Sequence, residues 1–450
     1  MTSEIEQRQE VSEVLAETEQ RYELLIESVT DYAIISLDLH GIVRDWNKGA
    51  ERIKGYRADE VVGRHGIVNL DGRGMLVVSV ARRLGSQVRL LAYCAARFKP
   101  SGAAKRRPRS VKLTMPGERM EYRHFGKTDL KVSAIGFGCW EIGGTYGRID
   151  ESEFERAVAQ AIDSGITCFD TAEAYGMGVS EEALARALGS RRNQVVIATK
   201  FGVGYDEMPN RRDSSPARVF SSIEQSLQRL KADHVDIYLV HWPDPLTPIA
   251  ETLAALDDIV RQGKARYVGV SNFRLGQIEE AMRLRRVDAV QYAWNMFDRR
   301  MRTEIFPYCA AQQIGVMAYG SLAYGMLSGA FHSGMRFEES DWRSKAGNLG
   351  SLNLFRTLFG PEHFQRNLAA AEELRPLAAK YGKSLPQFAL RWTLSNPVVG
   401  TALVGFRTAA EVSENLGALG WEISNADMAE VDAILTRHGA VTVPPGWLED

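Results

Sequence analysis

Four polar side chains follow three successive apolar runs near the middle of the chain. Asp170 and Tyr175 lie in FDTAEAYG and Lys200 lies in ATKFG, while His241 follows in LVHWPDP. A tyrosine can give a proton to a carbonyl oxygen, and a nearby ammonium lowers the pKa of the phenol from about 10. An aspartate would balance the charge of the lysine, and a neutral histidine would donate a hydrogen bond to the oxygen as negative charge develops. Together the four residue types could transfer a proton to an oxygen atom on which negative charge develops.

Each of these side chains also has an ordinary structural explanation. Asp170 could cap a helix, and Tyr175 could anchor a loop. Lys200 could be solvated, and His241 could be a hydrogen-bonded polar residue before a turn. Catalysis is favoured because all four follow consecutive predicted strands and would therefore meet at one edge of a parallel sheet.

The elements that must position these side chains are eight short β-rich runs separated by amphipathic helical patterns. This alternation predicts a parallel sheet with right-handed crossovers, and eight units in roughly 330 residues fit an α/β fold, the (β/α)8 TIM barrel. An open doubly wound sheet is the alternative, but its GxGxxG candidate at Gly136 has Glu141 in the third glycine position. The predicted strands are 134–138, 167–169, 195–199, 236–240, 267–270, 289–292, 315–318 and 400–404.

The interval between the last two predicted strands is too long for a single loop. It contains predicted helices over 365–381 and 386–395, and Ser384 and Pro386 are start signals for the second. The preceding stretch, 327–362, is rich in glycine and serine. Because barrel active sites lie at the carboxyl ends of the strands, we predict that this stretch covers the site.

Eight motifs extend over the predicted barrel: GFGCW, FDTAEAYG, ATKFG, LVHWPDP, GKARYVGVSNF, VQYAWN, AYGSLAYGMLSG and GFRTAAEVSENL. Through them, essentially all of residues 120–450 resembles the aldo/keto reductases. Within that superfamily the chain is most similar to the bacterial stress-protein and inositol-cluster reductases, which are cousins of the potassium-channel β subunits. The resemblance implies a catalytic tetrad in which Tyr175 is the general acid, and its members are Asp170, Tyr175, Lys200 and His241.

The resemblance also implies a nicotinamide cofactor. By this resemblance, the carboxamide would contact Ser271, Asn272 and Gln291, and the nicotinamide ring would contact Tyr319. The pyrophosphate would contact Ser321 and Leu322. The adenosine end would contact Gly405, Arg407 and Asn415. Arg407 favours NADP(H) over NAD(H), because a guanidinium binds phosphate through two parallel hydrogen bonds. Glu411 departs from the family, which often has Gln there, and a carboxylate is less favourable to a phosphate.

Three aromatic residues, Trp140, Tyr146 and Trp242, are predicted to line an apolar pocket for a small-molecule carbonyl or alcohol substrate. The alternative is that they belong to the core at the barrel rim. The predicted function is NADPH-dependent reduction of aldehydes and ketones to alcohols. The alternative function is an NADP(H)-binding redox sensor with slow turnover, in keeping with the resemblance to channel subunits.

Charge divides the chain into three predicted parts. Residues 66–119 hold 12 Lys and Arg against 2 Asp and Glu, whereas residues 1–65 hold 8 against 14. A basic block between acidic stretches marks a boundary. We therefore predict a partial domain over 1–65, a basic and poorly structured linker over 66–119, and the barrel over 120–450. Within the linker, 75–80 and 88–94 could form strands.

The first part combines a predicted helix over 4–28 with two predicted strands, 33–37 and 42–46. It contains Asp31-Tyr32-Ala33, Asp38, Gly41, Trp46-Asn47, Gly49-Ala50-Glu51, Gly55-Tyr56 and Gly63. This pattern resembles the first half of a PAS sensor domain, and the resemblance ends at His65. Residues 66–119 are too short to supply the second half, so we expect an incomplete PAS-like α+β segment.

Composition limits the other classes of function. The net charge of −2 excludes a globally basic nucleic-acid binder, and the basic run 105–109 lacks interleaved aromatic residues. The most apolar early stretch, 75–94, contains three arginines and is not a membrane helix. The four cysteines form no CxxC and predict neither disulfides nor a metal site. We expect a cytoplasmic protein without metal, nucleic-acid or membrane partners, and the sequence does not predict its oligomeric state.

Overall fold

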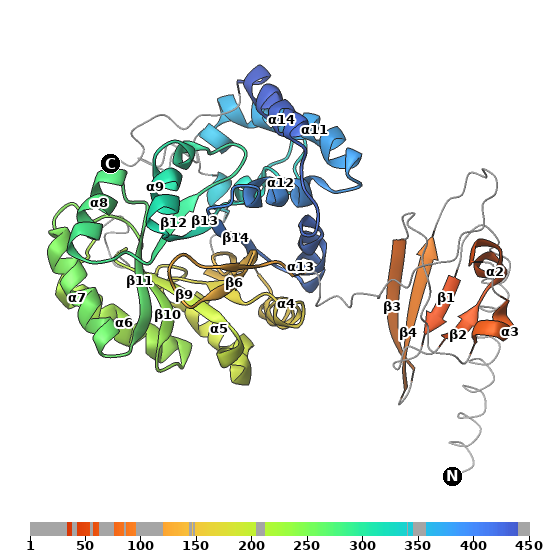
Figure 1. Cartoon of the computed structure of the whole chain (residues 1–450), viewed down its shortest axis with the longest axis horizontal. Coiled ribbons are helices and arrows are strands. Elements are labelled where there is room, and N and C mark those ends of the chain that lie inside the picture. Colours follow the sequence, from red (N-terminus) through yellow and green to blue (C-terminus); the bar gives the residue numbers. More distant parts are fainter. Residues whose placement is uncertain are drawn as a thin grey trace, which may run out of the picture. The chain divides into compact units, whose positions relative to one another are not determined.

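The computed structural model describes most of the C-terminal part of the chain and several segments of the N-terminal part. The described residues are 34–37, 43–54, 57–62, 76–84, 87–95, 120–143, 146, 149–203, 212–339, 341–344 and 357–439. The chain divides into two compact units, Met1–Thr114 and Met115–Asp450, and each is described by itself (Figure 1). The predicted helix over 4–28 and the basic run 105–109 lie outside the described residues.

The N-terminal unit contains a four-stranded antiparallel sheet of order β2-β1-β4-β3. Asn47 accepts a 2.8 Å hydrogen bond from the Ala50 N–H and so helps to begin the first described helix after the second strand. The elements are β1 (Ile34–Leu37), β2 (Val43–Trp46), α2 (Lys48–Lys54), α3 (Ala58–Val61), β3 (Leu76–Leu84) and β4 (Gln87–Ala95). The first two strands lie where the sequence predicts them.

Strands β3 and β4 lie within 66–119, for which the sequence predicts a poorly structured linker. The two strands overlap 75–80 and 88–94, which the sequence allows as strands, and they pair in register from Leu76 opposite Ala95 to Leu84 opposite Gln87. This part of 66–119 is therefore more ordered than a poorly structured linker. The valines of β3 have high β propensity, and backbone pairing does not depend on the arginines that make the stretch basic. The resemblance of this unit to a PAS domain stays a prediction.

The C-terminal unit is a closed barrel of eight parallel strands in the order β10-β11-β12-β13-β14-β7-β8-β9. The strands are β7 (Ile135–Gly138), β8 (Cys168–Asp170), β9 (Val196–Phe201), β10 (Val235–Val240), β11 (Ala265–Ser271), β12 (Ala289–Ala293), β13 (Gly315–Tyr319) and β14 (Val399–Gly405). Pairing of Ala402 with Ile135 closes the ring between the last and the first strand. The predicted TIM barrel and its eight strands are confirmed, and the doubly wound alternative is wrong.

Helices surround the strands, as Figure 1 shows. They are α4 (Glu151–Asp163), α5 (Val179–Leu188), α6 (Pro216–Leu230), α7 (Ile249–Arg261), α8 (Leu275–Leu284), α9 (Ile305–Gln312), α11 (Pro361–Lys380), α12 (Leu385–Leu394), α13 (Ala409–Asn415) and α14 (Asn425–Arg437). Side-chain caps fix several starts: the Asp150 carboxylate, for example, accepts from the backbone N–H groups of Ser152 and Glu153. The two helices predicted between strands seven and eight are confirmed as α11 and α12.

A small hairpin packs against the strands. Strands β5 (Tyr122–His124) and β6 (Lys131–Ser133) pair antiparallel, and the turn between them carries the fully buried Phe125. Gly315 begins β13, and Gly400 is the second residue of β14. A Cβ atom at either position would collide with the Phe125 ring. These glycines therefore admit the aromatic ring at the amino-terminal end of the barrel.

The barrel interior is apolar toward this end and polar toward the carboxyl ends of the strands. Phe125, Cys168, Ile237, Leu239 and Met317 belong to one buried apolar cluster. The buried polar side chains of Asp170, Lys200 and Gln291 lie at or near the carboxyl ends of their own strands. The fold thus places polar side chains at the carboxyl ends of the strands, and an apolar cluster fills the barrel interior next to them. None of the helices in the described part of the chain is long and apolar enough to cross a membrane.

Candidate active site

The four predicted catalytic residues are held at one rim by neighbouring strands. Asp170 is the last residue of β8, and Lys200 lies next to the end of β9. His241 directly follows β10, and its backbone N–H donates to the Phe201 carbonyl at 2.9 Å, which extends the pairing of β9 with β10. Tyr175 lies in the turn that follows β8, where its backbone N–H donates to the carbonyl of Ala172.

Lys200 is the centre of the hydrogen-bond network. Its fully buried Nζ donates to Asp170 Oδ2 at 2.7 Å, to the Thr171 carbonyl at 2.9 Å and to the Tyr175 hydroxyl at 3.0 Å. An ammonium has three protons, so all of its donors are used. Because the Tyr175 oxygen accepts from Lys200, the phenolic proton of Tyr175 remains available for donation to another group.

Asp170 and Lys200 form a buried ion pair. Burial raises the pKa of Asp170 and lowers the pKa of Lys200, and in each case the attraction of the partner opposes the shift. A second hydrogen bond, from Gln291 Nε2 to Asp170 Oδ1 at 2.7 Å, further favours the ionised carboxylate. The pair therefore fixes the position of the lysine beneath Tyr175.

The structure corrects the expectation for the pKa of Tyr175. The sequence predicts that the Lys200 ammonium lowers it, but burial raises the pKa of Tyr175 well above its usual value of about 10, and Asp170, Glu141 and Cys139 raise it further. Loss of hydration of a phenolate outweighs the ammonium at this depth. Tyr175 therefore holds its proton at neutral pH, as a proton donor must.

His241 lies edge-on to Tyr175, with the ring centroids 5.8 Å apart. Burial first, and then the Lys200 charge, lower the pKa of His241 well below 6.5, so the imidazole is neutral at pH 7. Its buried Nδ1 has no hydrogen-bond partner among the described residues. A neutral imidazole at this place can hydrogen-bond to a ligand next to Tyr175.

The residues implied for the nicotinamide end form one chain of hydrogen bonds. Tyr319 donates from its hydroxyl to Asn272 Oδ1 at 2.9 Å, and Asn272 Nδ2 lies 3.0 Å from Ser271 Oγ. Ser271 Oγ in turn donates to the backbone carbonyl of Gln291 at 2.9 Å. Since the Gln291 amide binds Asp170, this network joins the tetrad directly.

The residues implied for the rest of the cofactor lie after β13 and at or after the end of β14. Ser321, beside Leu322, donates to the Ala318 carbonyl at 3.1 Å. Gly405 ends β14, and the buried Asn415 ends α13 with an Oδ1 that has no partner among the described residues. Buried polar atoms without partners fit a bound polar ligand. The orphan atoms of Asn415 and His241 are therefore compatible with a dinucleotide across this rim.

Arg407 and Glu411 are already joined through the backbone. The Arg407 N–H donates to Glu411 Oε2 at 2.7 Å, so this carboxylate supports the start of α13. The Arg407 guanidinium donates from Nη2 to the Tyr146 carbonyl at 3.0 Å. Arg407 thus lies between β14 and the segment after β7, with further donors left for an anion.

An aromatic cluster lies beside the tetrad. Trp140 stacks on Tyr175 with centroids 6.1 Å apart and meets Tyr146 edge-on at 5.0 Å. Two residues that sequence reasoning missed complete it: Trp342 stacks on Trp140 at 5.9 Å, and Tyr324 meets Trp342 edge-on at 5.7 Å. Trp342 comes from the glycine- and serine-rich stretch after β13, and a lone tryptophan in such a stretch was the available signal.

The third aromatic residue predicted for the pocket, Trp242, has a different neighbour. The guanidinium carbon of Arg212 lies 5.1 Å from the centroid of its ring. No ring contact between Trp242 and the cluster of Trp140, Tyr146, Tyr324 and Trp342 is present among the described residues. The roles of Trp140, Tyr146 and Trp242 toward a substrate stay predictions.

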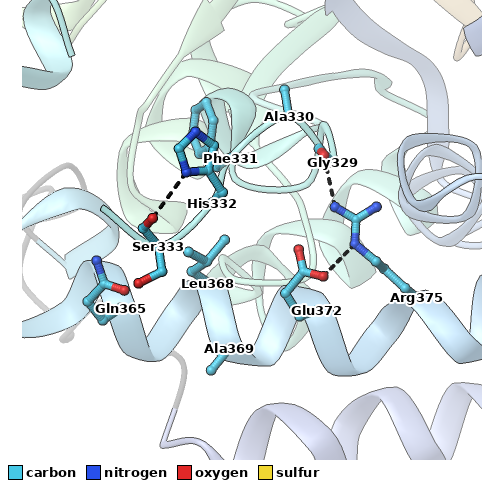
Figure 2. Close-up of a pocket in the computed structure, with 10 residues that line it drawn as sticks. All are labelled: Gly329, Ala330, Phe331, His332, Ser333, Gln365, Leu368, Ala369, Glu372 and Arg375. Carbon is cyan, nitrogen blue, oxygen red and sulfur yellow. Dashed lines mark hydrogen bonds and ion pairs between the residues drawn. The ribbon is translucent and has the colours of Figure 1, made fainter. Parts of the chain in front are cut away.

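A separate open cavity of about 460 Å³ lies against α11. Figure 2 shows residues 329–333 facing Leu368 and Glu372 of that helix, with Arg375 bonded to the Gly329 carbonyl and to the Glu372 carboxylate. None of the predicted site residues lines this cavity. Within the described ranges, no group of three or more His, Cys, Asp or Glu side chains is placed to hold a metal ion.

Comparisons with known proteins agree with this geometry. The sequence pattern of the Aldo/keto reductase family matches residues 134–436. The chain is 35% identical over 333 residues to "Aldo-keto reductase YhdN" of Bacillus subtilis, a match that covers 73% of this chain and 98% of that protein. It is 31% identical over 332 residues to the "NADH-specific methylglyoxal reductase" of Escherichia coli, covering 70% of this chain and 97% of that protein.

A solved structure is similar as well. The glycerol dehydrogenase AKR11B4 from Gluconobacter oxydans superimposes with a TM-score of 0.63 at 35% identity, covering 72% of this chain and 98% of that one. The closed barrel, the four polar side chains at its rim and the family match lead to one assignment. The chain belongs to the aldo/keto reductase family, which uses a nicotinamide cofactor to reduce small carbonyl compounds.

Proposed function

We propose that the protein is an NADP(H)-dependent carbonyl reductase or alcohol dehydrogenase in which Tyr175 is the general acid. The observation that carries the proposal is the contact of the Tyr175 hydroxyl with Lys200 Nζ at 3.0 Å, in a buried network that leaves the phenolic proton unused. A bound nicotinamide cofactor would supply the hydride to the carbonyl carbon. Tyr175, which is half-buried at the site, would supply the proton.

The other members of the tetrad support this proton transfer. As the phenol gives up its proton, negative charge appears on the Tyr175 oxygen, and the Lys200 ammonium 3.0 Å away stabilises it. Asp170 keeps the lysine charged and in place. The neutral His241 would donate a hydrogen bond to the substrate oxygen and orient the carbonyl toward Tyr175.

We propose NADP(H) as the preferred cofactor because of Arg407, whose guanidinium keeps donors beyond its bond to the Tyr146 carbonyl. The nicotinamide end would be held by Ser271, Asn272, Gln291 and Tyr319. The pyrophosphate would meet Ser321 and Leu322, and the adenosine end would meet Gly405, Arg407 and Asn415. NAD(H) is the alternative, since one similar protein is named as NADH-specific.

A second candidate function is an NADP(H)-binding redox sensor with slow turnover. The favouring observation is that Asp341 pairs through its backbone with Tyr146 and Trp342 stacks on Trp140, so that the stretch after β13, predicted to cover the site, contacts the segment after β7. Such a cover would slow cofactor release. The reductase requires a small-molecule carbonyl substrate, whereas the redox sensor requires only the bound dinucleotide.

The test is to measure steady-state rates on a panel of aldehydes and ketones with NADPH and with NADH, beside the rate of cofactor release. Turnover of at least one carbonyl with NADPH, faster than with NADH, is the expected result. Turnover that never exceeds a very slow cofactor release would favour the sensor. If the full chain binds neither dinucleotide, the proposed cofactor site is wrong.

A further inference from the structure

A glutamate whose side chain no part of the proposed mechanism uses lies against Gly405, one of the residues of the proposed cofactor site. Glu141 follows Trp140 and begins the short 3-10 helix η2 (Glu141–Gly143) after β7. Its carboxylate rests on the backbone of Gly405 at the end of β14, so that a Cβ at position 405 would overlap both carboxylate oxygens and Cδ. The two ends of the barrel sequence thus meet at this contact.

Charged groups from three other segments surround this carboxylate. Arg407 follows β14, Glu411 lies on α13, and Arg343 comes from the stretch after β13, and all three act on Glu141 electrostatically. On its own side of the rim, Glu141 acts on Cys139, Tyr146 and Tyr175.

Neither arginine is committed to Glu141. Arg343 is paired with the Asp341 carboxylate, and Arg407 donates to the Tyr146 carbonyl. No ion pair between Glu141 and either guanidinium is present among the described residues. When Glu141 is ionised, the two negative charges of Glu141 and Glu411 therefore outnumber the single positive charge of Arg407, and this part of the site carries a net negative charge.

Glu141 can change its charge near neutral pH. The side chain is half-buried, and the enclosure of its carboxylate raises the pKa to about 7. The nearby Glu411 adds to this rise, whereas the backbone N–H of Glu141, Arg407 and Arg343 oppose it. A negatively charged ligand brought beside the group would raise its pKa further, because like charges repel.

We propose that Glu141 is a further residue of the cofactor pocket, and that its carboxylate weakens binding of the negatively charged dinucleotide when it is ionised. This inference rests on the proposed function, because it assumes that the cofactor meets Gly405 and Arg407. Binding and protonation are then linked: the protonated form binds more tightly, and binding takes up a proton. Affinity therefore falls as the pH rises through about 7. A shift of one pKa unit on binding corresponds to a roughly tenfold change in the dissociation constant.

The experiment measures the dissociation constant of NADH for the full chain by fluorescence titration between pH 6 and 8.5. NADH is the better probe for pH, because the 2′-phosphate of NADPH is a phosphomonoester that titrates near pH 6 itself. The variants are Glu141→Gln, which keeps the shape of the side chain, and Glu414→Gln, a control that removes an exposed carboxylate from α13. NADPH at pH 8 is measured in parallel.

The expected result is a roughly tenfold weaker binding of NADH at pH 8.5 than at pH 6 for the wild type and for Glu414→Gln. Glu141→Gln should bind both dinucleotides more tightly than the wild type at pH 8 and should lose the pH dependence. Calorimetry of the wild type in two buffers of different ionisation heat should show proton uptake on binding at pH 7.5. This second readout does not depend on how well the variant folds.

Two outcomes would overturn the inference: the same pH dependence in Glu141→Gln as in the wild type, or no proton uptake by the wild type near pH 7. Failure of the proposed function looks different. In that case the wild type binds neither NADH nor NADPH at any pH, and the cofactor site itself is wrong.

Discussion

Gln291 Nε2 donates to Asp170 Oδ1 at 2.7 Å, while Lys200 Nζ donates to the other oxygen of the same carboxylate at 2.7 Å. The aspartate therefore links a residue proposed to hold the nicotinamide with the lysine that contacts the proton donor. Both hydrogen bonds are buried. The proton-transfer side and the cofactor side of the site share one carboxylate. A substitution on either side should therefore also affect the other.

The first prediction concerns this link. Gln291→Leu removes the donor to a buried carboxylate oxygen, and we expect the free energy of unfolding to fall by about 1–3 kcal/mol. Cofactor affinity should fall as well, since Gln291 is proposed to bind the carboxamide. Urea unfolding gives the stability, and Gln228→Leu, at an exposed position of α6, is the control. Equal stability of the two variants would mean that the Gln291 bond contributes nothing.

The second prediction concerns the general acid. Tyr175→Phe removes the proton but keeps the ring, so the fold and the affinity for NADPH should be unchanged. Carbonyl reduction should fall at least ~100-fold, the usual scale for a lost general acid. Stopped-flow and steady-state rates check this, with Tyr308→Phe on α9 as the control. Near-normal turnover of Tyr175→Phe would contradict the mechanism.

The third prediction concerns Arg407. Arg407→Ala should weaken NADPH binding by roughly 1–3 kcal/mol, the scale of a charge-assisted hydrogen bond, and should leave NADH nearly unaffected. Fluorescence titration with both dinucleotides is the measurement. Equal losses for the two cofactors would show that Arg407 does not recognise the 2′-phosphate, and would point instead to its bond with the Tyr146 carbonyl.

The fourth prediction is a pH dependence of stability. The pKa of His241 in the folded chain lies well below its usual value of 6.5, chiefly because of burial. The unfolded chain therefore binds this proton more readily, and stability should decline as the pH falls from about 6.5 toward the lowered value. His241→Gln should lose part of this decline. Urea unfolding at pH 7.5, 6.5 and 5.5 compares the two proteins, and parallel curves would exclude a contribution of His241.

The fifth prediction concerns the N-terminal part. A shortened chain that begins at Met120 should keep specific activity and thermal stability with NADPH within about twofold, because the barrel closes its own sheet without a strand from residues 1–119. Direct comparison with the full chain tests this. An insoluble or inactive short form would mean that residues 1–119 are part of the working fold.

Local sequence determined the barrel strands and the chemical types at its rim. Runs such as 237–240 are apolar over most of a strand. This pattern needs no distant information, since burial on both faces of a parallel strand requires it. The sequence allowed strands over 75–80 and 88–94, where β3 and β4 lie, but it did not predict that they pair with each other and with β1, because composition does not reveal the partner of a strand.

Only the tertiary structure decided which side chains meet and in which charge state. Asp170 and Gln291 are 121 residues apart in the chain, and closure of the barrel brings them to one hydrogen bond. Trp342 reaches Trp140 from a stretch with no periodic pattern, so no local signal could pair them. The pKa values of Tyr175 and Glu141 depend on burial, which the folded environment sets, and this is why residue types alone gave the wrong direction for Tyr175.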